Sequence, residues 1–194
     1  MKKLLLLIRL LKDIPVFWGD FFLGVMQFNS SFMAGIFRKK IYRTNCFLDT
    51  MVTITNWRNF YSKKGSALYH ACYVLNANGK FYIGERSHLG AYCYVNVCYG
   101  KIVIGNDVAI GPGTKIIAYS NNFRKGRKVT EERIVKDVII GSNVLIGANC
   151  SILPGTIIHD NVVVGAGAVV NGELKSNAIY AGVPAKIIKD GWYE

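Results

Sequence analysis

The chain has 194 residues, 51% of them hydrophobic, and a formal net charge of +12 at pH 7. This length allows one sizeable core with an appendage and excludes two full-sized domains. The five cysteines form no CxxC pair and no zinc-ligand spacing, which excludes a zinc module and indicates buried thiols in a reducing compartment.

The positive charge is concentrated near the N-terminus. Residues 1–64 contain eleven Lys and Arg against three Asp, which leaves about +4 for the rest of the chain. Residues 1–45 also contain a short apolar run that imitates a signal peptide. Arg9 and Lys12 interrupt that run and no small-x-small cleavage site precedes Pro15, so we expect the segment to stay on the chain.

Residues 1–45 are therefore predicted to form an apolar and basic helical segment. Helices that lie on an anionic membrane surface would explain both the aromatic residues and the charge. Two alternatives stay open. Residues 16–37 could span a membrane, although Asp20 would cost about 2.5–3.5 kcal/mol near the centre of the span. The helices could instead pack on the rest of the protein or on a second subunit. Nucleic-acid binding is disfavoured, because the aromatic residues are not interleaved with the basic ones.

The next part of the chain changes from an irregular to a repeating pattern. Residues 44–78 contain short strand-like runs without a clear period, and we expect irregular first coils there. Residues 79–95 then match residues 100–116 at an offset of 21. One coil of eighteen residues with a three-residue insertion would explain this offset.

A six-residue period organises the following stretch, residues 138–170. Neither a helix nor a single strand has this period, but a chain that turns a corner after each short strand does. Three such units make one triangular coil, and stacked coils bury an aliphatic column. The second position of each unit is often Gly, which we expect to allow a tight turn, and the fifth is small or branched. An ordinary antiparallel sheet would instead alternate with period two. The inward positions are Ile140, Ile146, Ile152, Ile158, Val164 and Val170.

These patterns predict an all-β solenoid, a parallel β-helix, over residues 46–175. Ile104 and Ile140 are thirty-six residues apart, or two coils, so one coil's length within residues 118–137 is expected to be extruded as a loop. Loops on a rigid scaffold often carry function, although a solvated surface flap is the alternative. This loop has six Lys and Arg against three acidic residues. Residues 176–194 are expected to cap the last open coil.

The ordered combination of IGPGTKI, an extruded loop, IGSNVLIGANCSILPGTII, VVVGAGAVV and IYAGVPAKII resembles the hexapeptide-repeat acyltransferases. Within that family it is most similar to the sugar O-acetyltransferases of cell-surface polysaccharide synthesis. The likeness covers residues 83–189. It implies a left-handed β-helix, a homotrimer, and acetyl-CoA bound as acyl donor between neighbouring subunits.

The resemblance also assigns residues to the cofactor. The small residues that contact CoA fall on Ala148 and Ala166, and Lys186 and Lys189 match basic positions that would meet the CoA phosphates. A solvated C-terminal tail is the alternative for the two lysines. Many relatives have Thr-Lys where this chain has Asn-Gly at 171–172, so one expected contact differs.

The catalytic position departs from the family pattern. Relatives have a histidine at the start of the loop that takes the proton from the acceptor hydroxyl. The matching place here is Asn121 or Asn122, and an amide cannot take a proton. Such an amide could orient the acceptor or hold the oxyanion, which is worth about 3 kcal/mol for one donor. His88 could serve as the base if a neighbouring subunit approaches it. We expect His88 and His159 to be outward-facing corner residues.

The sequence thus predicts an acetyl-CoA-dependent O-acyltransferase that modifies a hydroxyl of a sugar or cell-surface glycan precursor. It is expected in the cytoplasm or peripherally at the inner membrane face. The alternative is a catalytically silent trimeric scaffold or binding protein that has lost the general base. Metal-dependent hydratase chemistry would need a histidine cluster, which three scattered histidines disfavour, so no metal is expected.

Overall fold

The computed structural model describes residues 45–193. The predicted N-terminal segment, with its membrane-surface, spanning and packing alternatives, lies outside the described residues. Within residues 45–193, no helix combines the length and apolar character needed to cross a membrane.

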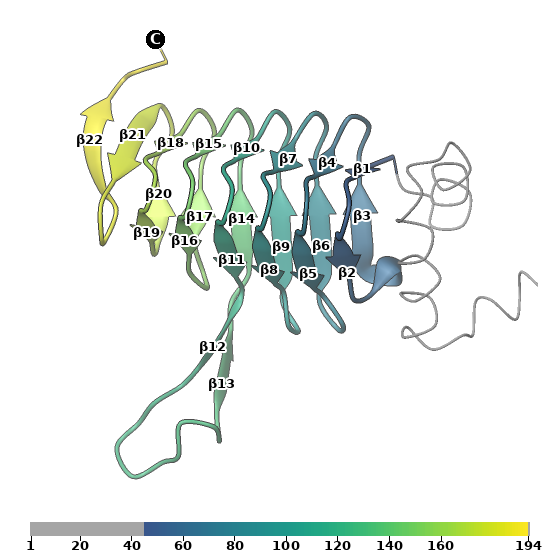
Figure 1. Ribbon diagram of the computed structural model, residues 1–194. Coiled ribbons are helices and arrows are strands. Elements are labelled where there is room, and N and C mark those ends of the chain that lie inside the picture. The colour runs from purple at the N-terminus through teal and green to yellow at the C-terminus, as the bar shows by residue number, and fades with distance from the viewer. Residues whose placement is uncertain (1–44, 194) are drawn as a thin grey trace, which may run out of the picture.

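The described chain winds into a three-sided solenoid whose sides are parallel sheets (Figure 1). Sheet A contains β1 (Phe47–Leu48), β4 (Ala67–Leu68), β7 (His88–Leu89), β10 (Ala109–Ile110), β15 (Leu145–Ile146), β18 (Val163–Val164), β21 (Ala178–Ala181) and the antiparallel β22 (Lys186–Asp190). Sheet B contains β2 (Thr53–Ile54), β5 (Tyr73–Leu75), β8 (Tyr94–Asn96), β11 (Lys115–Ile117), β16 (Ser151–Ile152) and β19 (Val169–Val170). Sheet C contains β3 (Phe60–Ser62), β6 (Lys80–Ile83), β9 (Lys101–Ile104), β14 (Val138–Ile140), β17 (Ile157–Ile158) and β20 (Glu173–Leu174).

The strand register confirms the predicted left-handed β-helix of about six coils. Lys80 lies beside Lys101, so the internal repeat at an offset of 21 is one coil of the solenoid. Ile104 lies beside Ile140, so the thirty-six residues between them make one coil and an extruded segment.

The six-residue pattern forms the core. All six predicted inward residues from Ile140 to Val170 are at most 1% exposed. The small fifth positions are also buried, from Val144 to Ala168. Each inward side chain lies against its counterpart in the next coil, so the apolar column is continuous and no single coil could form it alone.

The first coils are regular, so the expectation of irregular winding was wrong. β1, β2 and β3 each pair in parallel with the strand one coil later, β4, β5 and β6. A short 3₁₀ helix, η1 (Trp57–Asn59), joins β2 to β3. The sequence pattern is obscured because the passage from sheet B to sheet C has an extra inward residue. In the second coil, Val74, Asn76, Phe81 and Ile83 are all buried, and their spacing is not six.

The corner glycines serve a different purpose from the one expected. Gly147 does not have a positive φ, but a Cβ atom on it would come within 2.7 Å of the Ala166 Cα in the next coil. These glycines therefore allow close coil stacking rather than a tight turn. The left-handed turn residue comes two positions later, as in Asn143, Asn149 and Asn161 with φ of 55°, 57° and 59°. Asparagine tolerates this conformation better than most residues with a side chain.

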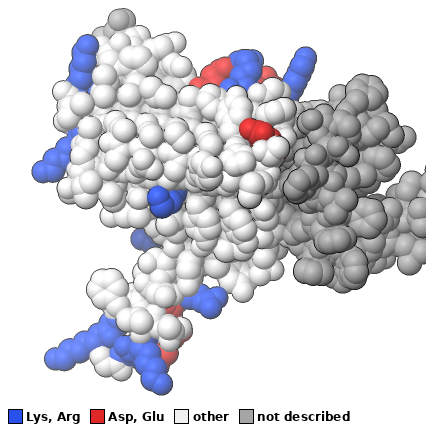
Figure 2. Space-filling view, viewed as in Figure 1, with Lys and Arg blue, Asp and Glu red and all other residues white. Residues whose placement is uncertain are grey.

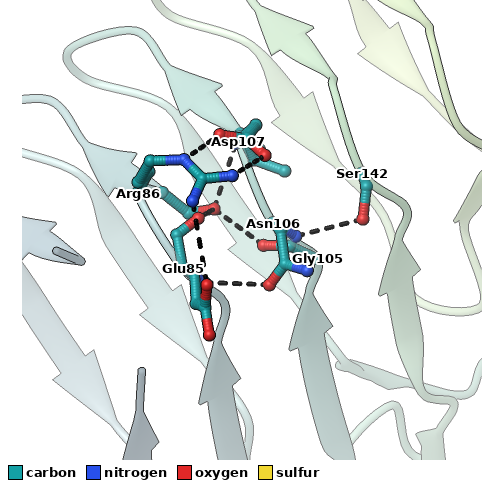
Figure 3. Close-up of polar contacts among 8 residues, drawn as sticks. Glu85, Arg86, Gly105, Asn106, Asp107 and Ser142 are labelled. Atoms are coloured by element: carbon teal, nitrogen blue, oxygen red, sulfur yellow. Dashed lines mark hydrogen bonds and ion pairs between the residues drawn. The ribbon is translucent and has the colours of Figure 1, made fainter. Parts of the chain in front are cut away.

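Polar side chains link successive coils along the corner between sheets C and A (Figure 3). Arg86 donates two hydrogen bonds of 2.6 Å to the Asp107 carboxylate, and this guanidinium lowers the pKa of Asp107. In the later coils, Asn143 donates to Asn161 (2.8 Å) and Asn161 donates to Asn177 (2.9 Å). These contacts hold each coil in position relative to the coil before it. They thereby also position the other two corners.

The extruded segment is a two-stranded antiparallel hairpin, β12 (Tyr119–Asn121) and β13 (Arg133–Val135). It leaves the solenoid at the corner between β11 and β14 and projects away from the body (Figure 1). Its backbone is anchored at the root, where Lys136 donates to the Ala118 carbonyl at 3.0 Å.

Replacing one inward residue should destabilise the whole solenoid. We expect Ile152→Ala to lower the free energy of unfolding by about 2–5 kcal/mol, because it opens a cavity in the column. The neighbouring outward substitution Ser151→Ala is the matched control and should change it by less than about 0.5 kcal/mol. Urea unfolding followed by circular dichroism measures both. Equal effects of the two changes would contradict the proposed inward column.

Candidate active site

A row of small residues lines the corner between sheets A and B. Ala148 and Ala166 occupy the same position in successive coils, and the Gly167 amide donates to the Ala148 carbonyl at 2.8 Å. A Cβ atom on Gly165 would come within 3.0 Å of the Ala181 Cβ, so Ala181 continues the row. This corner therefore offers a flat edge, here called the A/B edge. Its small residues are Gly111, Gly113, Gly147, Ala148, Gly165, Ala166, Gly167, Ala181 and Gly182.

The two C-terminal lysines lie on the last strand of sheet A, with Lys186 next to the A/B edge and Lys189 toward the corner between sheets C and A. In the antiparallel pair of β21 and β22, Lys186 lies opposite Ala181 and Lys189 lies opposite Ile179. The two lysines are three residues apart but their partners are only two apart, because β22 has a β-bulge beside Ile179 and Tyr180. In a regular strand, residues three apart point to opposite faces. The extra residue of the bulge places both lysines on the outward side of sheet A, where their partners Ala181 and Ile179 also point.

The hairpin separates the two asparagine candidates. Asn121 lies opposite Arg133, and its side chain accepts a hydrogen bond of 2.7 Å from the Tyr119 hydroxyl. Asn122 is the next residue, so its side chain points to the other face of the hairpin. There its amide donates to the Glu132 carboxylate at 2.8 Å. Only one of the two asparagines can therefore meet a given chemical group of a bound acceptor.

The hairpin is basic toward its tip (Figure 2). Arg124 pairs with Glu132 at 3.6 Å and Arg127 pairs with Glu131 at 3.7 Å. Lys125 and Lys128 are exposed. The outer end of the hairpin thus keeps positive charge after its own ion pairs are formed.

The histidines differ from one another in place and partner. His88 faces outward as expected, but it lies within β7 and not at a corner, where Ala67 and Ala109 flank it in sheet A. The edge of its ring packs against Tyr69, with ring centroids 5.6 Å apart. His159 is an exposed corner residue, and its Nε2 lies 2.6 Å from the Glu173 carboxylate.

The described residues offer no thiol nucleophile with an exposed sulfur at the A/B edge. Burial raises the pKa of Cys46 to about 11, and burial also raises the pKa of Cys150. Cys93 is buried against Cys72, and the hydrogen bond between the two thiols raises the pKa of Cys93. In residues 45–193, no three His, Cys, Asp or Glu side chains lie close enough together to hold a metal ion.

The structure therefore brings some predicted site residues together and separates others. Ala148, Ala166 and Lys186 lie at the A/B edge, whereas Lys189 lies toward the other corner of sheet A, and the hairpin leaves from the corner between sheets B and C. Sequence reasoning missed Glu132, which holds the Asn122 amide. The signal was present, because residues 119–121 and 133–135 could have been recognised as the two arms of a hairpin.

The family profile described as bacterial transferase hexapeptide (six repeats) matches residues 137–172. WbbJ of Escherichia coli (strain K12), provisionally named a lipopolysaccharide biosynthesis O-acetyl transferase, is 32% identical over 160 residues. That match covers 77% of this chain and 78% of WbbJ. The chain therefore belongs to the hexapeptide-repeat acyltransferases.

Two further relatives are similar over part of the chain. Galactoside O-acetyltransferase of Escherichia coli (strain K12) is 31% identical over 115 residues, which cover 57% of each chain. A mutant of AntD, an N-acyltransferase from Bacillus cereus in complex with dTDP and Coenzyme A, superimposes with a TM-score of 0.68. The sequence identity to AntD is 26%, and the match covers 75% of this chain and 80% of AntD.

Proposed function

We propose that this protein transfers an acyl group from acetyl-CoA to a hydroxyl of a sugar or cell-surface glycan precursor. Its relatives WbbJ and galactoside O-acetyltransferase are named for O-acetyl transfer, and AntD was solved with Coenzyme A. The observation that carries the proposal is the A/B edge, where Ala148 and Ala166 leave room for an extended chain. Lys186 beside this edge, and Lys189 farther along β22, would meet the CoA phosphates as point charges.

The proposed active site needs two subunits. The A/B edge and the root of the hairpin lie at different corners of one solenoid. In a homotrimer, the hairpin of one subunit would reach the A/B edge of the next, so that three equivalent sites form at three interfaces. The apolar outer row of sheet A, which includes Leu145 at 48% exposed, supports burial against a neighbouring copy.

The reaction joins the acceptor oxygen to the acyl carbon. The sugar hydroxyl attacks the thioester carbonyl, the new C–O bond forms, the C–S bond breaks, and CoA leaves as a thiol after taking up a proton. Asn122, oriented by Glu132 at 2.8 Å, would accept a hydrogen bond from the hydroxyl or stabilise the oxyanion. His88 of the adjacent subunit is the proposed base. Asn121, on the other hairpin face, would contact the acceptor without taking part in proton transfer.

An amino sugar is a second candidate acceptor. Asn122 stands where relatives have a basic histidine, and AntD is named an N-acyltransferase. A neutral amine already has a lone pair for attack, so it does not need a base before the N–C bond forms. Comparing hydroxyl and amino acceptors of the same sugar would therefore separate the two chemistries.

Blocking the A/B edge tests the proposed function. We expect Ala166→Trp to raise the Kd for acetyl-CoA by about tenfold or more, because an indole would occupy the path of the acyl donor. Ser176→Trp is the matched control, since Ser176 is an exposed residue at the corner between sheets C and A. Calorimetry and a free-thiol assay with sugar acceptors measure binding and turnover. If the unmodified protein does not bind acetyl-CoA, the silent scaffold would replace the enzyme.

Restoring a histidine at the hairpin tests the role of Asn122. We expect Asn122→His to raise kcat for a hydroxyl acceptor by about tenfold to a hundredfold, because Glu132 is already placed to orient the imidazole. Asn121→His, on the opposite face, should give no such gain. Steady-state kinetics from pH 5 to 8 check this, since an imidazole base should add a dependence near pH 6.5. A gain from Asn121→His alone would place the reacting hydroxyl on the other face.

We also propose that the protein associates peripherally with the inner membrane face. Besides the basic residues of the N-terminal sequence, the first coils expose large apolar side chains near their end of the solenoid. Aromatic residues with a polar end favour the membrane–water interface, and Lys and Arg favour anionic headgroups. The exposed side chains are Phe47, Met51, Tyr61, Tyr69 and Tyr73.

Binding to vesicles tests the membrane proposal. We expect the protein to sediment with vesicles containing phosphatidylserine, and less so as salt is raised. Lys63→Glu with Lys64→Glu should weaken binding by about tenfold or more, since each lysine near the surface is worth about 1 kcal/mol. The same double change at Lys125 and Lys128 on the hairpin is the control. An equal loss of vesicle binding in the two double variants would indicate that net charge alone attracts the protein to the vesicles.

A further inference from the structure

One face of the hairpin presents hydrogen-bond donors and a positive charge in a fixed arrangement. The Arg133 guanidinium lies over the Tyr119 ring, 5.7 Å from its centroid, and the Arg133 backbone pairs with Asn121. The Tyr119 hydroxyl donates to the Asn121 side-chain oxygen at 2.7 Å. The amide nitrogen of Asn121 is thereby left as a donor beside the guanidinium. Tyr119, Asn121 and Arg133 are called the donor face below.

The acidic residues of the hairpin are all engaged elsewhere. Glu131 pairs with Arg127 at 3.7 Å, and Glu132 holds both Arg124 and the Asn122 amide. Asp137 accepts a hydrogen bond of 2.8 Å from the Lys101 backbone amide at the hairpin root. Among residues 45–193, no carboxylate pairs with Arg133. The donor face therefore has a cation held by an aromatic ring rather than by an acid.

This arrangement fits a phosphate better than a neutral sugar. A guanidinium presents several N–H donors in a plane that matches two phosphate oxygens, and an adjacent amide can donate to a third. Lys125 and Lys128, near the tip of the same hairpin, would attract an anion from a distance (Figure 2).

The donor face is also separate from the lysines proposed for CoA. The hairpin leaves the fourth coil, whereas Lys186 and Lys189 lie on β22 beyond the last coil (Figure 1). The protein thus has two basic regions along its axis. If one serves the acyl donor, the other is available to the acceptor.

The geometry points to an acceptor sugar that carries a phosphate or diphosphate, bound through Arg133 and Asn121 while Tyr119 holds both in position. This inference rests on the proposed acyl transfer and specifies its substrate class. The phosphate could belong to a sugar phosphate, a nucleoside diphosphate sugar, or a sugar on a lipid diphosphate, because all three present the same oxygens to the donor face.

The first experiment measures inorganic pyrophosphate binding to the full protein saturated with CoA, so that the CoA site is already filled. We expect pyrophosphate to bind, and Arg133→Ala to raise its Kd by about tenfold. Arg133→Lys should recover part of the affinity. Tyr119→Phe, which keeps the ring but loses the hydroxyl, should have a smaller effect. Arg127→Ala, which removes a guanidinium paired with Glu131, is the matched control and should change the Kd less than about twofold.

The second experiment measures kcat/KM for methyl glycosides, glycuronides, sugar 1-phosphates and nucleoside diphosphate sugars, and for lipid diphosphate sugars in vesicles. We expect one of the phosphorylated classes to be preferred, with the preference reduced in Arg133→Ala through KM.

Preference for a methyl glycoside or a glycuronide, no pyrophosphate binding, or an equal loss of pyrophosphate affinity in Arg127→Ala would overturn the inference. So would weaker CoA binding in Arg133→Ala, which would assign the donor face to the cofactor. Failure of the proposed function is distinguishable, because acetyl-CoA would then not bind or react at all.

Discussion

The structure depends on the burial of apolar side chains on all three sides of every coil. Since successive inward residues stack directly on one another, each coil supplies the apolar surface that the next one covers. This stacking works only if the coils approach closely, and the corner glycines allow it because a Cβ atom there would collide with the next coil. Turn residues such as Asn161 then close the corners and link the coils through their amides.

A solenoid of this kind has few places for a binding site. Its interior is filled, and its sides are flat sheets. What remains is a corner lined by small residues, such as the A/B edge with Ala148 and Ala166, and a segment that leaves the regular winding, such as the hairpin. These two features lie at different corners of the same chain. The account of function therefore requires a second copy to bring the hairpin and the edge together.

The sequence predicted the column well because every inward residue contributes to one period. Ile140 and Val170 follow from the period alone, and so does the length of the extruded segment after Ile104. The period could not predict the regular first coils, since the extra buried residue Asn76 breaks the spacing of six. It also could not reveal which residues lie across the hairpin from Asn121 and Asn122, because this depends on strand pairing across the eleven residues between β12 and β13. Contacts between distant segments, such as Asn122 with Glu132, leave no periodic trace in the sequence.

The central claim is that each active site combines the hairpin of one subunit with the A/B edge of another. The most direct test uses two inactive variants that carry different tags. Ala166→Trp blocks the edge, and Asn122→Trp blocks the hairpin. The two variants are co-expressed, trimers that contain both tags are purified, and acyl transfer by these mixed trimers is measured. Every trimer that contains both variants has one interface, of its three, that combines an intact hairpin with an intact edge, so activity should return to about one third of that of the unmodified protein. Mixed trimers with no more activity than either variant alone would show that the site lies within a single chain, and would contradict this account.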